Sequence, residues 1–456
     1  MIQNRPAPSD ANGLTVRVHG YKAFRDETAL RIRPLTLLYG HNQAGKSTLV
    51  RLLAWLADSI RSDSGPLDMR SSALCGASFK ELGWLGPNPN FSPSIELQGP
   101  YESESAFCRF TWTWSASNSP ELNEFQVWKG ASRDNRERLF YARIDSVEAG
   151  ATKYSGFMGQ EEWTGVLQTN SLFPQGLPDG AAAACSAVHL ATTQLQEVLW
   201  LGANRLAGSG AGTQRHVREY RSDGSDLPYL LQNQPAVVRH ISQWFEQQFR
   251  SKLELSTNIE GRPGFYLRSP GWEHLPIHLA GEGVRSLLPI IAHAAWAESR
   301  KTGAPKMLAI EEPESHLHPN LQIAMLNRLI ETTTAGVPVV LETHSVHVLR
   351  AVQLAVLNGD IAASSVGLYW CSSEAGVASL GEATIDANGR LLGWPPAVFE
   401  EEQALGREIV EKRWGMSAST VGLAEVADMA SSEGALLTDG GILTADDPIA
   451  IGDEGR

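Results

Sequence analysis

The clearest pattern of apolar and polar positions lies near the start of the chain. A short apolar run over residues 35–38 ends at Gly40, and apolar residues recur at helical spacing over residues 49–56. This order predicts a buried strand, a glycine-rich loop and a helix. Apolar and polar residues alternate at 14–19 and 29–33, which predicts two short strands before the buried strand.

A second set of elements lies in the C-terminal half. Short apolar runs at residues 307–310 and 337–341 predict buried parallel strands. One helical pattern opens near Gly281, before the first of these strands, and another, over residues 321–332, lies between them. Strands that alternate with helices in this way predict an α/β domain. Further strands are expected at 366–370 and 377–380.

The stretch between these two sets is interpreted as an insertion rich in β-structure. Residues 107–114, 125–128 and 139–144 are dominated by aromatic and β-branched residues, which predicts a small sheet. We interpret the tryptophans of 107–114 as an inward-facing core row, and stacking on nucleobases is the alternative. The other expected elements are helices over 182–199 and 235–249, strands over 253–259 and 265–268, and loops over 61–105 and 150–180.

Composition indicates an ordinary globular protein. Of 456 residues, 42% are hydrophobic and 20% are charged, and this length favours two lobes over one compact core. The longest apolar runs fall short of the roughly 20 residues of a membrane helix, and the first 13 residues contain no apolar signal segment. The four cysteines lie far apart, which is typical of free thiols in a reducing compartment. We therefore expect a cytoplasmic protein without a membrane partner.

The formal net charge of −13 is unevenly distributed. Residues 415–456 carry eight acids and one arginine. Residues 201–268 carry nine basic and six acidic residues; they could follow a phosphate backbone, or place solvated arginines on ordinary helices. The overall acidity argues against a protein coated with nucleic acid but does not exclude a local basic surface.

Residues 40–47 read GHNQAGKS and match G-x-x-x-x-G-K-[ST] in the strand–loop–helix context that this motif requires. In such loops, backbone N–H groups and the positive end of the helix dipole surround nucleotide phosphates. Lys46 reaches the outer phosphates, and Ser47 offers its hydroxyl to Mg²⁺. The sequence therefore predicts a site for ATP and Mg²⁺ that is formed by Gly40, His41, Asn42, Gln43, Ala44, Gly45, Lys46, Ser47 and Thr48.

Two strand ends carry candidate catalytic groups. The run at 307–310 is followed by Glu311 and Glu312, and paired carboxylates are the expected partner of a phosphate loop. One carboxylate holds Mg²⁺ and the other polarises the attacking water. The run at 337–341 ends in ETHS, which places His344 at the edge where α/β sheets bind ligands. A capping or core histidine is the alternative for His344.

Gly281 and Gly283 lie where a helix is expected to begin, within HLAGEGVRSLLP. Exposed N–H groups at a helix start can bind an anion, so this is a second candidate phosphate site. A plain glycine turn before a buried helix is the alternative.

The motifs GHNQAGKST, GEGVRSLLP, LAIEEPESHLHP and ETHS follow one another in the chain. In this order they resemble the ABC/SMC-type ATPase head, and more closely the bacterial OLD-like (overcoming lysogenization defect) AAA-family ATPases. The resemblance covers residues 14–402. It implies an α/β fold, namely an ABC/SMC-type P-loop ATPase head with a mixed β-sheet and a long inserted α+β region.

The resemblance implies roles for individual residues. Lys46 and Ser47 would bind the phosphates and Mg²⁺, and Glu311 would be the Walker B metal ligand. Glu312 would be the catalytic base, and His344 the switch histidine at the γ-phosphate.

The segment from Gly281 to Ser286 would be the signature, which in such heads caps the nucleotide of the other subunit. ATP would thus be buried between two copies of the chain. A serine is usual in this segment, but Ala280 and Gly281 stand in its place, and Arg285 or Ser286 could substitute. Gly281, Gly283, Arg285 and Ser286 are accordingly assigned to nucleotide binding.

Five parts are expected along the chain. They are an N-terminal part of the head with the phosphate loop (1–60), an inserted region (61–270), a C-terminal part of the head (271–371), a small C-terminal domain (372–412) and an acidic, disordered tail (413–456), with a disordered leader at 1–13. Many OLD proteins also carry a TOPRIM nuclease. Residues 346–456 are too short and too poor in paired acids for one.

The leading interpretation is an ATPase that forms a homodimer or a higher even oligomer around ATP. By resemblance alone, it would act as a sensor or regulator on double-stranded DNA, or on a separate effector such as a nuclease or toxin, in anti-phage defence. The alternative is a nucleotide-gated scaffold with negligible turnover that holds a partner protein. A transporter subunit is disfavoured by the long insertion.

Overall fold

The computed structural model describes residues 14–63, 65–84, 92–114, 119–148, 151–205, 221–258 and 261–395. The predicted leader (1–13) and tail (413–456) lie outside these residues. The described residues up to Trp394 group into one compact unit, and the helices and strands named below belong to it. No helix in the described part of the chain is both long and apolar enough to cross a bilayer.

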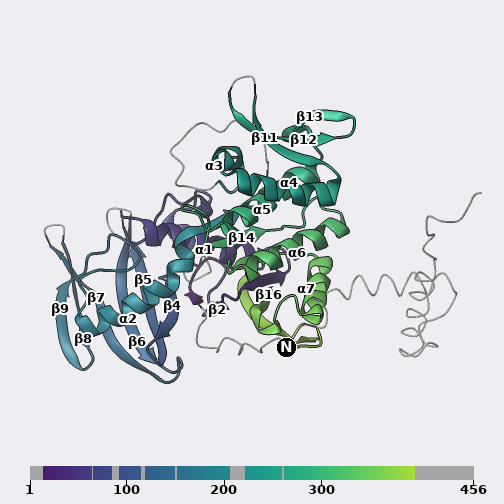
Figure 1. The fold of residues 1–456 in the computed structure, drawn as a ribbon. Coiled ribbons are helices and arrows are strands. Elements are labelled where there is room, and N and C mark those ends of the chain that lie inside the picture. Colours follow the sequence, from purple (N-terminus) through teal and green to yellow (C-terminus); the bar gives the residue numbers. More distant parts are fainter. Residues whose placement is uncertain are drawn as a thin grey trace, which may run out of the picture. The chain divides into compact units, whose positions relative to one another are not determined.

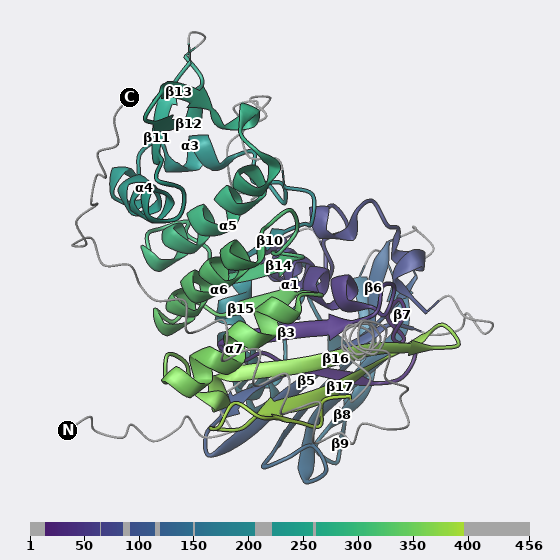
Figure 2. The ribbon, with the colours of Figure 1, turned by 90° about the vertical axis from the view of Figure 1, so that its right-hand side faces the viewer.

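A seven-stranded mixed sheet contains the strand that leads into the phosphate loop. Its order is β10-β14-β15-β3-β16-β17-β18 (Figure 2). The first five strands run parallel to one another. Strand β17 pairs antiparallel with β16, and β18 pairs antiparallel with β17. The bounds are β10 Val198–Leu201, β14 Met307–Glu311, β15 Val339–Glu342, β3 Leu35–Gly40, β16 Val366–Glu374, β17 Val377–Ile385 and β18 Leu391–Leu392. This is the mixed α/β sheet that was expected for a P-loop ATPase head.

Four helices pack on this sheet or on a neighbouring helix. The first, α1 (Lys46–Arg61), begins directly after the phosphate loop and buries Leu49, Leu52, Leu53 and Leu56, the residues whose spacing predicted it, against β3, β10, β14 and β15. The others are α5 (Glu282–Glu298), α6 (Pro319–Thr334) and α7 (Val346–Asn358), which contact each other in chain order (Figure 2).

An eight-stranded antiparallel sheet forms a second layer, with α2 (Asp179–Ala191) lying across it (Figure 1). Its inner face is aromatic: Phe110, Trp112, Phe125 and Phe140 are fully buried. The core interpretation of the tryptophan-rich run is therefore confirmed for Trp112 but wrong for Trp114, which is exposed. In sheet order the strands are β2 Thr28–Arg31, β1 Thr15–His19, β4 Ser94–Tyr101, β5 Glu104–Trp114, β6 Pro120–Gly130, β7 Arg136–Glu148, β8 Ala151–Met158 and β9 Glu161–Val166.

A three-stranded antiparallel sheet lies with two helices beyond α5 (Figure 1). It consists of β11 (Lys252–Thr257), β12 (Pro263–Ser269) and β13 (Trp272–Pro276), and α4 (Pro235–Phe249) contacts both β11 and α5. The remaining elements are α3 Leu227–Leu231 and the 3₁₀ turns Ser72–Leu74, Phe79–Leu82, Thr192–Glu197, Ile277–Leu279 and Ala363–Ser365.

Three local predictions were wrong. Residues 150–180 were expected to be loop, but they contain β8, which pairs with β7, and β9, which pairs with β8. The helix expected over 182–199 ends at Ala191, and Val198–Leu201 is the edge strand of the central sheet. The expected loop over 61–105 contains β4. In each case the strand is stabilised by pairing with another strand of its sheet, which the propensity of its own residues does not reveal.

The sheets cross the borders of the predicted parts. Strands β1 and β2, from the predicted N-terminal part of the head, join the sheet whose other six strands lie in the predicted insertion. Conversely, β10 lies in the predicted insertion but joins the central sheet. The division into five parts itself stays a prediction.

Candidate nucleotide-binding site

The phosphate loop has the backbone geometry that its glycines predicted. Gly40 ends β3 with φ +145°, and a Cβ there would lie 2.1 Å from the carbonyl oxygen of Cys371. Gly45 caps α1 with φ +95°, and a Cβ there would meet the ring of Phe24 at 2.8 Å. Both positions therefore require glycine.

Lys46 and Ser47 lie in the first turn of α1. The Lys46 side chain is buried; its Nζ donates to the carbonyl oxygens of Gly40 (3.0 Å) and His41 (2.8 Å). Burial lowers the pKa of Lys46, and the neighbouring Glu342 opposes that shift. Ser47 Oγ donates to Glu342 Oε1 at 2.8 Å. The first turn of α1 thus presents a cation and a hydroxyl beside the carboxylate of Glu342.

A cavity of about 300 Å³ opens above the start of α1. It brings together residues from the phosphate loop and from the two strand ends that the sequence singled out. Its lining is Ala23, Asn42, Gln43, Gly45, Lys46, Ser47, Thr48, Glu312, Glu342 and His344.

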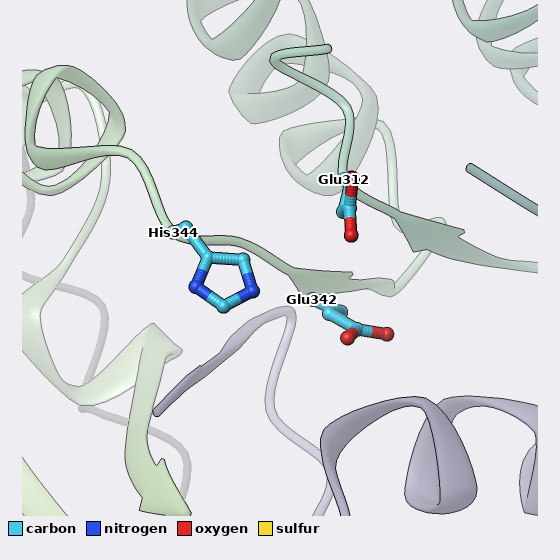
Figure 3. A group of neighbouring side chains, drawn as sticks. All are labelled: Glu312, Glu342 and His344. Atoms are coloured by element: carbon cyan, nitrogen blue, oxygen red, sulfur yellow. The ribbon is translucent and has the colours of Figure 1, made fainter. Parts of the chain in front are cut away.

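Glu312, Glu342 and His344 lie beside one another (Figure 3), and all three line this cavity. One ligand atom from each lies within 4.8 Å of the others. Burial raises the pKa of Glu342 to about 7, and it lowers the pKa of His344. A carboxylate pair and an imidazole this close can share a cation or position a water molecule.

Glu312 is held in an unusual backbone conformation. Its φ is +42°, a region that non-glycine residues seldom adopt and that is often found at functional sites. Its N–H donates to the carbonyl oxygen of Glu342 (2.8 Å), and Ser315 Oγ donates to its Oε2 (3.1 Å). These contacts fix the carboxylate at the cavity.

Glu311 does not line the cavity. Both of its oxygens accept hydrogen bonds from Arg51 of α1, from Nε at 2.6 Å and from Nη2 at 2.8 Å, and Trp200 Nε1 donates to Oε1 at 2.9 Å. The sequence assigned this residue to the metal. In the structure its carboxylate forms a bidentate ion pair with Arg51, which joins α1 to β14, and the hydrogen bond from Trp200 adds β10.

The signature residues lie away from the cavity. Gly281 caps α5 and is exposed, and a Cβ on Gly283 would lie 2.8 Å from the carbonyl oxygen of His316. Ser286 is buried, and its Oγ donates back to the carbonyl oxygens of Glu282 (2.9 Å) and Ser315 (3.2 Å). Arg285 is half-buried. None of the four assigned residues is among those that line the cavity.

Sequence reasoning missed Glu342 and Arg205. Glu342 was seen only as part of a polar quartet, although it ends an apolar strand just as Glu311 does, and that signal could have identified it. Arg205 is buried and donates to the carbonyl oxygens of Glu311 (2.6 Å), Glu312 (2.8 Å) and Ser286 (3.2 Å). Its role depends on contacts far apart in the chain, which no local pattern indicates.

Comparison with known proteins supports an ATPase. The family model of the AAA ATPase domain matches residues 232–349. This range includes Glu312, Glu342 and His344 but not the phosphate loop. None of the curated proteins compared matches the chain.

Among solved structures, the chain is similar to SMC head domains. The SMC head from Thermotoga maritima aligns at 12% identity with a TM-score of 0.41, over 81% of this chain and 98% of that chain. An SMC head bound to the C-terminal winged-helix domain of ScpA aligns at 11% identity with a TM-score of 0.48, over 82% of this chain and 98% of that chain. An SMC head with an extended coiled coil is bound to the C-terminal domain of ScpA derived from Pyrococcus furiosus. It aligns at 10% identity with a TM-score of 0.45, over 87% of this chain and 99% of that chain. These values are too low to transfer a partner or an activity.

The fold around the phosphate loop is that of a P-loop α/β domain. A parallel strand leads through a glycine-rich loop into α1, and β15 lies between the phosphate-loop strand and β14. The carboxyl ends of these three strands meet at one edge of the sheet, because Leu38, Glu342 and Glu311 are in register. That edge is where α/β sheets bind ligands.

Proposed function

We propose that this chain binds ATP with Mg²⁺ and hydrolyses it, and that two copies of the chain close around the nucleotide. The convergence of Lys46, Glu312 and His344 on one cavity carries this proposal. These residues are far apart in sequence, and each matches a group that phosphoryl transfer requires: a cation for the phosphates, a base for water and a donor near the transferred phosphoryl.

The phosphates would lie on the N–H groups of the loop and the start of α1. Lys46 Nζ, which donates to two loop carbonyls, would turn to the phosphate oxygens. The hydroxyl and carboxylate oxygens beside it fit Mg²⁺, a cation that prefers oxygen ligands. Mg²⁺ would neutralise negative charge on the phosphates during transfer.

Glu312 would accept a proton from the attacking water. Its carboxylate lines the cavity, and its backbone is fixed by Glu342, Ser315 and Arg205. His344 would donate a hydrogen bond to the γ-phosphate from the opposite side. Because both groups are already in place, little reorganisation would accompany the chemical step.

The exposed start of α5 supports the dimer. Gly281 and Glu282 are exposed and do not line the cavity of their own chain. Their N–H groups would instead meet the nucleotide held by a second copy, and hydrolysis would separate the two.

A scaffold with negligible turnover is the second candidate. One observation favours it: the Ser286 hydroxyl already donates to carbonyl oxygens of the chain and is buried. The signature then lacks a free serine hydroxyl for the γ-phosphate. A wild-type hydrolysis rate near background, together with an ATP-dependent dimer, would support this candidate.

The finer function rests on the family resemblance alone. We propose that the ATPase responds to double-stranded DNA or acts on a separate effector protein, a nuclease or toxin, as a cytoplasmic defence system. Hydrolysis measured with and without double-stranded DNA tests the first part. A rate that DNA does not change would direct the search to a protein partner.

The ATPase itself is tested by phosphate release from ATP and Mg²⁺. Glu312→Gln removes the base and should lower kcat by about 10²- to 10⁴-fold while ATP still binds. Lys46→Ala should abolish ATP binding, because the phosphates lose their cation.

Glu161→Gln, at an exposed position on β9, is the matched control and should leave both kcat and ATP binding unchanged. An unchanged rate in Glu312→Gln would show that Glu312 is not the base.

A further inference from the structure

Two glutamates end neighbouring strands beside the phosphate loop. Glu311 of β14 and Glu342 of β15 are register partners in a parallel pair. Opposite them, Ser47 and Arg51 lie one turn apart on α1 and therefore on the same face of that helix. Ser47 contacts Glu342 and Arg51 contacts Glu311. The helix thus presents a hydroxyl to one carboxylate and a guanidinium to the other.

Glu311 already has its cation. It is buried, and it accepts two short hydrogen bonds from Arg51 and a third from Trp200. A bidentate arginine–carboxylate pair is among the stronger polar contacts in proteins. To bind Mg²⁺, Glu311 would have to give up its hydrogen bonds from Arg51. The metal ion would then lie beside the positive charge of that guanidinium.

Glu342 is buried but incompletely paired. Its Oε1 accepts from Ser47, whereas Oε2 is buried and has no hydrogen-bond partner among the described residues. Lys46 Nζ lies 4.0 Å from Oε1, beyond hydrogen-bond distance. A buried carboxylate oxygen without a partner is costly, so such an atom calls for a ligand.

The geometry around Glu342 fits a small divalent cation. Adjacent oxygen ligands of octahedral Mg²⁺, each about 2.1 Å from the ion, lie about 3 Å apart. Ser47 Oγ and Glu342 Oε1 are 2.8 Å apart. The ligand atoms of Glu312 and His344 lie within 4.8 Å of that of Glu342.

We propose that Glu342, together with Ser47, holds the divalent cation of the bound nucleotide, and that Glu311 is a structural partner of Arg51. This inference rests on the proposed ATP binding. It moves the metal carboxylate from the strand where the sequence motif places it to the neighbouring strand.

The test measures how strongly Mg²⁺ and nucleotide binding are coupled. The dissociation constant of a fluorescent, non-hydrolysable ATP analogue is determined with Mg²⁺ and with EDTA, for the full-length wild type, Glu342→Gln and Glu311→Gln. In the wild type, Mg²⁺ should tighten binding at least about tenfold. Glu342→Gln should lose this gain, and Glu311→Gln should keep it within about threefold. The reverse result for the two variants overturns the proposal.

A second pair of variants is used because Glu311→Gln breaks a buried ion pair and can unfold the chain. Cysteine thiolate binds soft cations in preference to Mg²⁺. Cd²⁺ should therefore restore the coupling in Glu342→Cys, where Mg²⁺ does not. Restoration by Cd²⁺ in Glu311→Cys alone would assign the ligand to Glu311 instead.

Failure of this inference differs from failure of the proposed function. A wild-type chain that binds no ATP analogue contradicts the proposed function. A wild-type chain that hydrolyses ATP, beside a Glu342→Gln variant that keeps the full Mg²⁺ effect, contradicts only the assignment of Glu342.

Discussion

At the scale of single residues, the helix that carries the signature contains a buried histidine. His293 of α5 is fully buried, its Nδ1 lies 2.7 Å from the carbonyl oxygen of Pro289, and its Nε2 has no hydrogen-bond partner in the described part of the chain. Burial lowers its pKa from 6.5 to about 4, and the bond to Pro289 opposes that shift. The folded chain therefore holds this ring neutral.

His293 predicts a loss of stability in mild acid. Between about pH 6.5 and pH 4 the unfolded chain binds the proton and the folded chain does not, so stability is complete above this window and falls as the pH is lowered. At pH 5 the loss is about 2 kcal/mol of unfolding free energy. Urea unfolding of the wild type and of His293→Gln at pH 7.5 and pH 5 measures it.

The exposed His347 on α7 supplies the control, as His347→Gln. The variant His293→Gln should lose about 2 kcal/mol less than the wild type on acidification, and His347→Gln should match the wild type. Equal losses in all three chains would mean that His293 does not stay neutral in the fold.

At the scale of elements, Arg205 joins three segments around the proposed base. It lies four residues beyond the end of β10, at Leu201. Its guanidinium donates to the carbonyl oxygens of Glu311 at the end of β14, of Glu312 next to it, and of Ser286 in α5. The guanidinium spreads its donors over Nε, Nη1 and Nη2, and each nitrogen bonds a different one of these carbonyls. A lysine has its three donors on a single nitrogen and does not span the same separation. Arg205 therefore acts as a positioning residue for Glu312.

Arg205→Lys should separate positioning from binding. Because Glu312 would lose one of the contacts that fix its backbone, kcat for ATP should fall by between about 10- and 100-fold. The dissociation constant of ATP should change little, since Arg205 does not line the cavity. Steady-state hydrolysis and nucleotide titration give the two values.

Arg239→Lys, on the exposed face of α4, is the matched control. A thermal unfolding midpoint for each variant distinguishes a misfolded protein from a folded protein in which only Glu312 is displaced. If a well-folded Arg205→Lys protein keeps its full kcat, the contact with Glu312 has no catalytic consequence.

At the scale of the whole molecule, the exposed helix start predicts an ATP-dependent dimer. Glu312→Gln with ATP and Mg²⁺ should double the molar mass measured by light scattering, because the nucleotide stays intact between the copies. A Glu312→Gln protein that remains monomeric with ATP would count against a shared site.

Gly281→Asp, made in the Glu312→Gln background, should abolish that dimer. An added Cβ at Gly281 meets no atom within 4 Å, so the monomer should fold and bind ATP normally. The new carboxylate would face the phosphates held by the second copy and repel them. Gly180→Asp is the control: Gly180 is also exposed and open, and it lies in the first turn of α2. It should leave the dimer intact.

Much of the fold could be predicted because its signals are local. The phosphate loop, the start of α1 and the strands that end at Glu311 and Glu342 follow from periodicity and glycine placement within short windows. The helix over Pro235–Phe249 also begins and ends where its pattern predicts. Strands β8 and β9 were missed, since β8 depends on pairing with β7 and β9 on pairing with β8. Strand β10 was mistaken for helix, since it depends on pairing with β14.

The sequence by itself determined which chemical groups are present and that they follow strands ending at one sheet edge. It could not decide which of the two glutamates that end neighbouring strands, Glu311 and Glu342, faces the hydroxyl of Ser47 and which faces Arg51. That choice depends on the packing of α1 against β14 and β15, between residues about 260 to 295 positions apart. Only the tertiary structure brings Arg51 and Trp200 to Glu311 and leaves Glu342 at the cavity, because ion pairs and burial are set by neighbours in space.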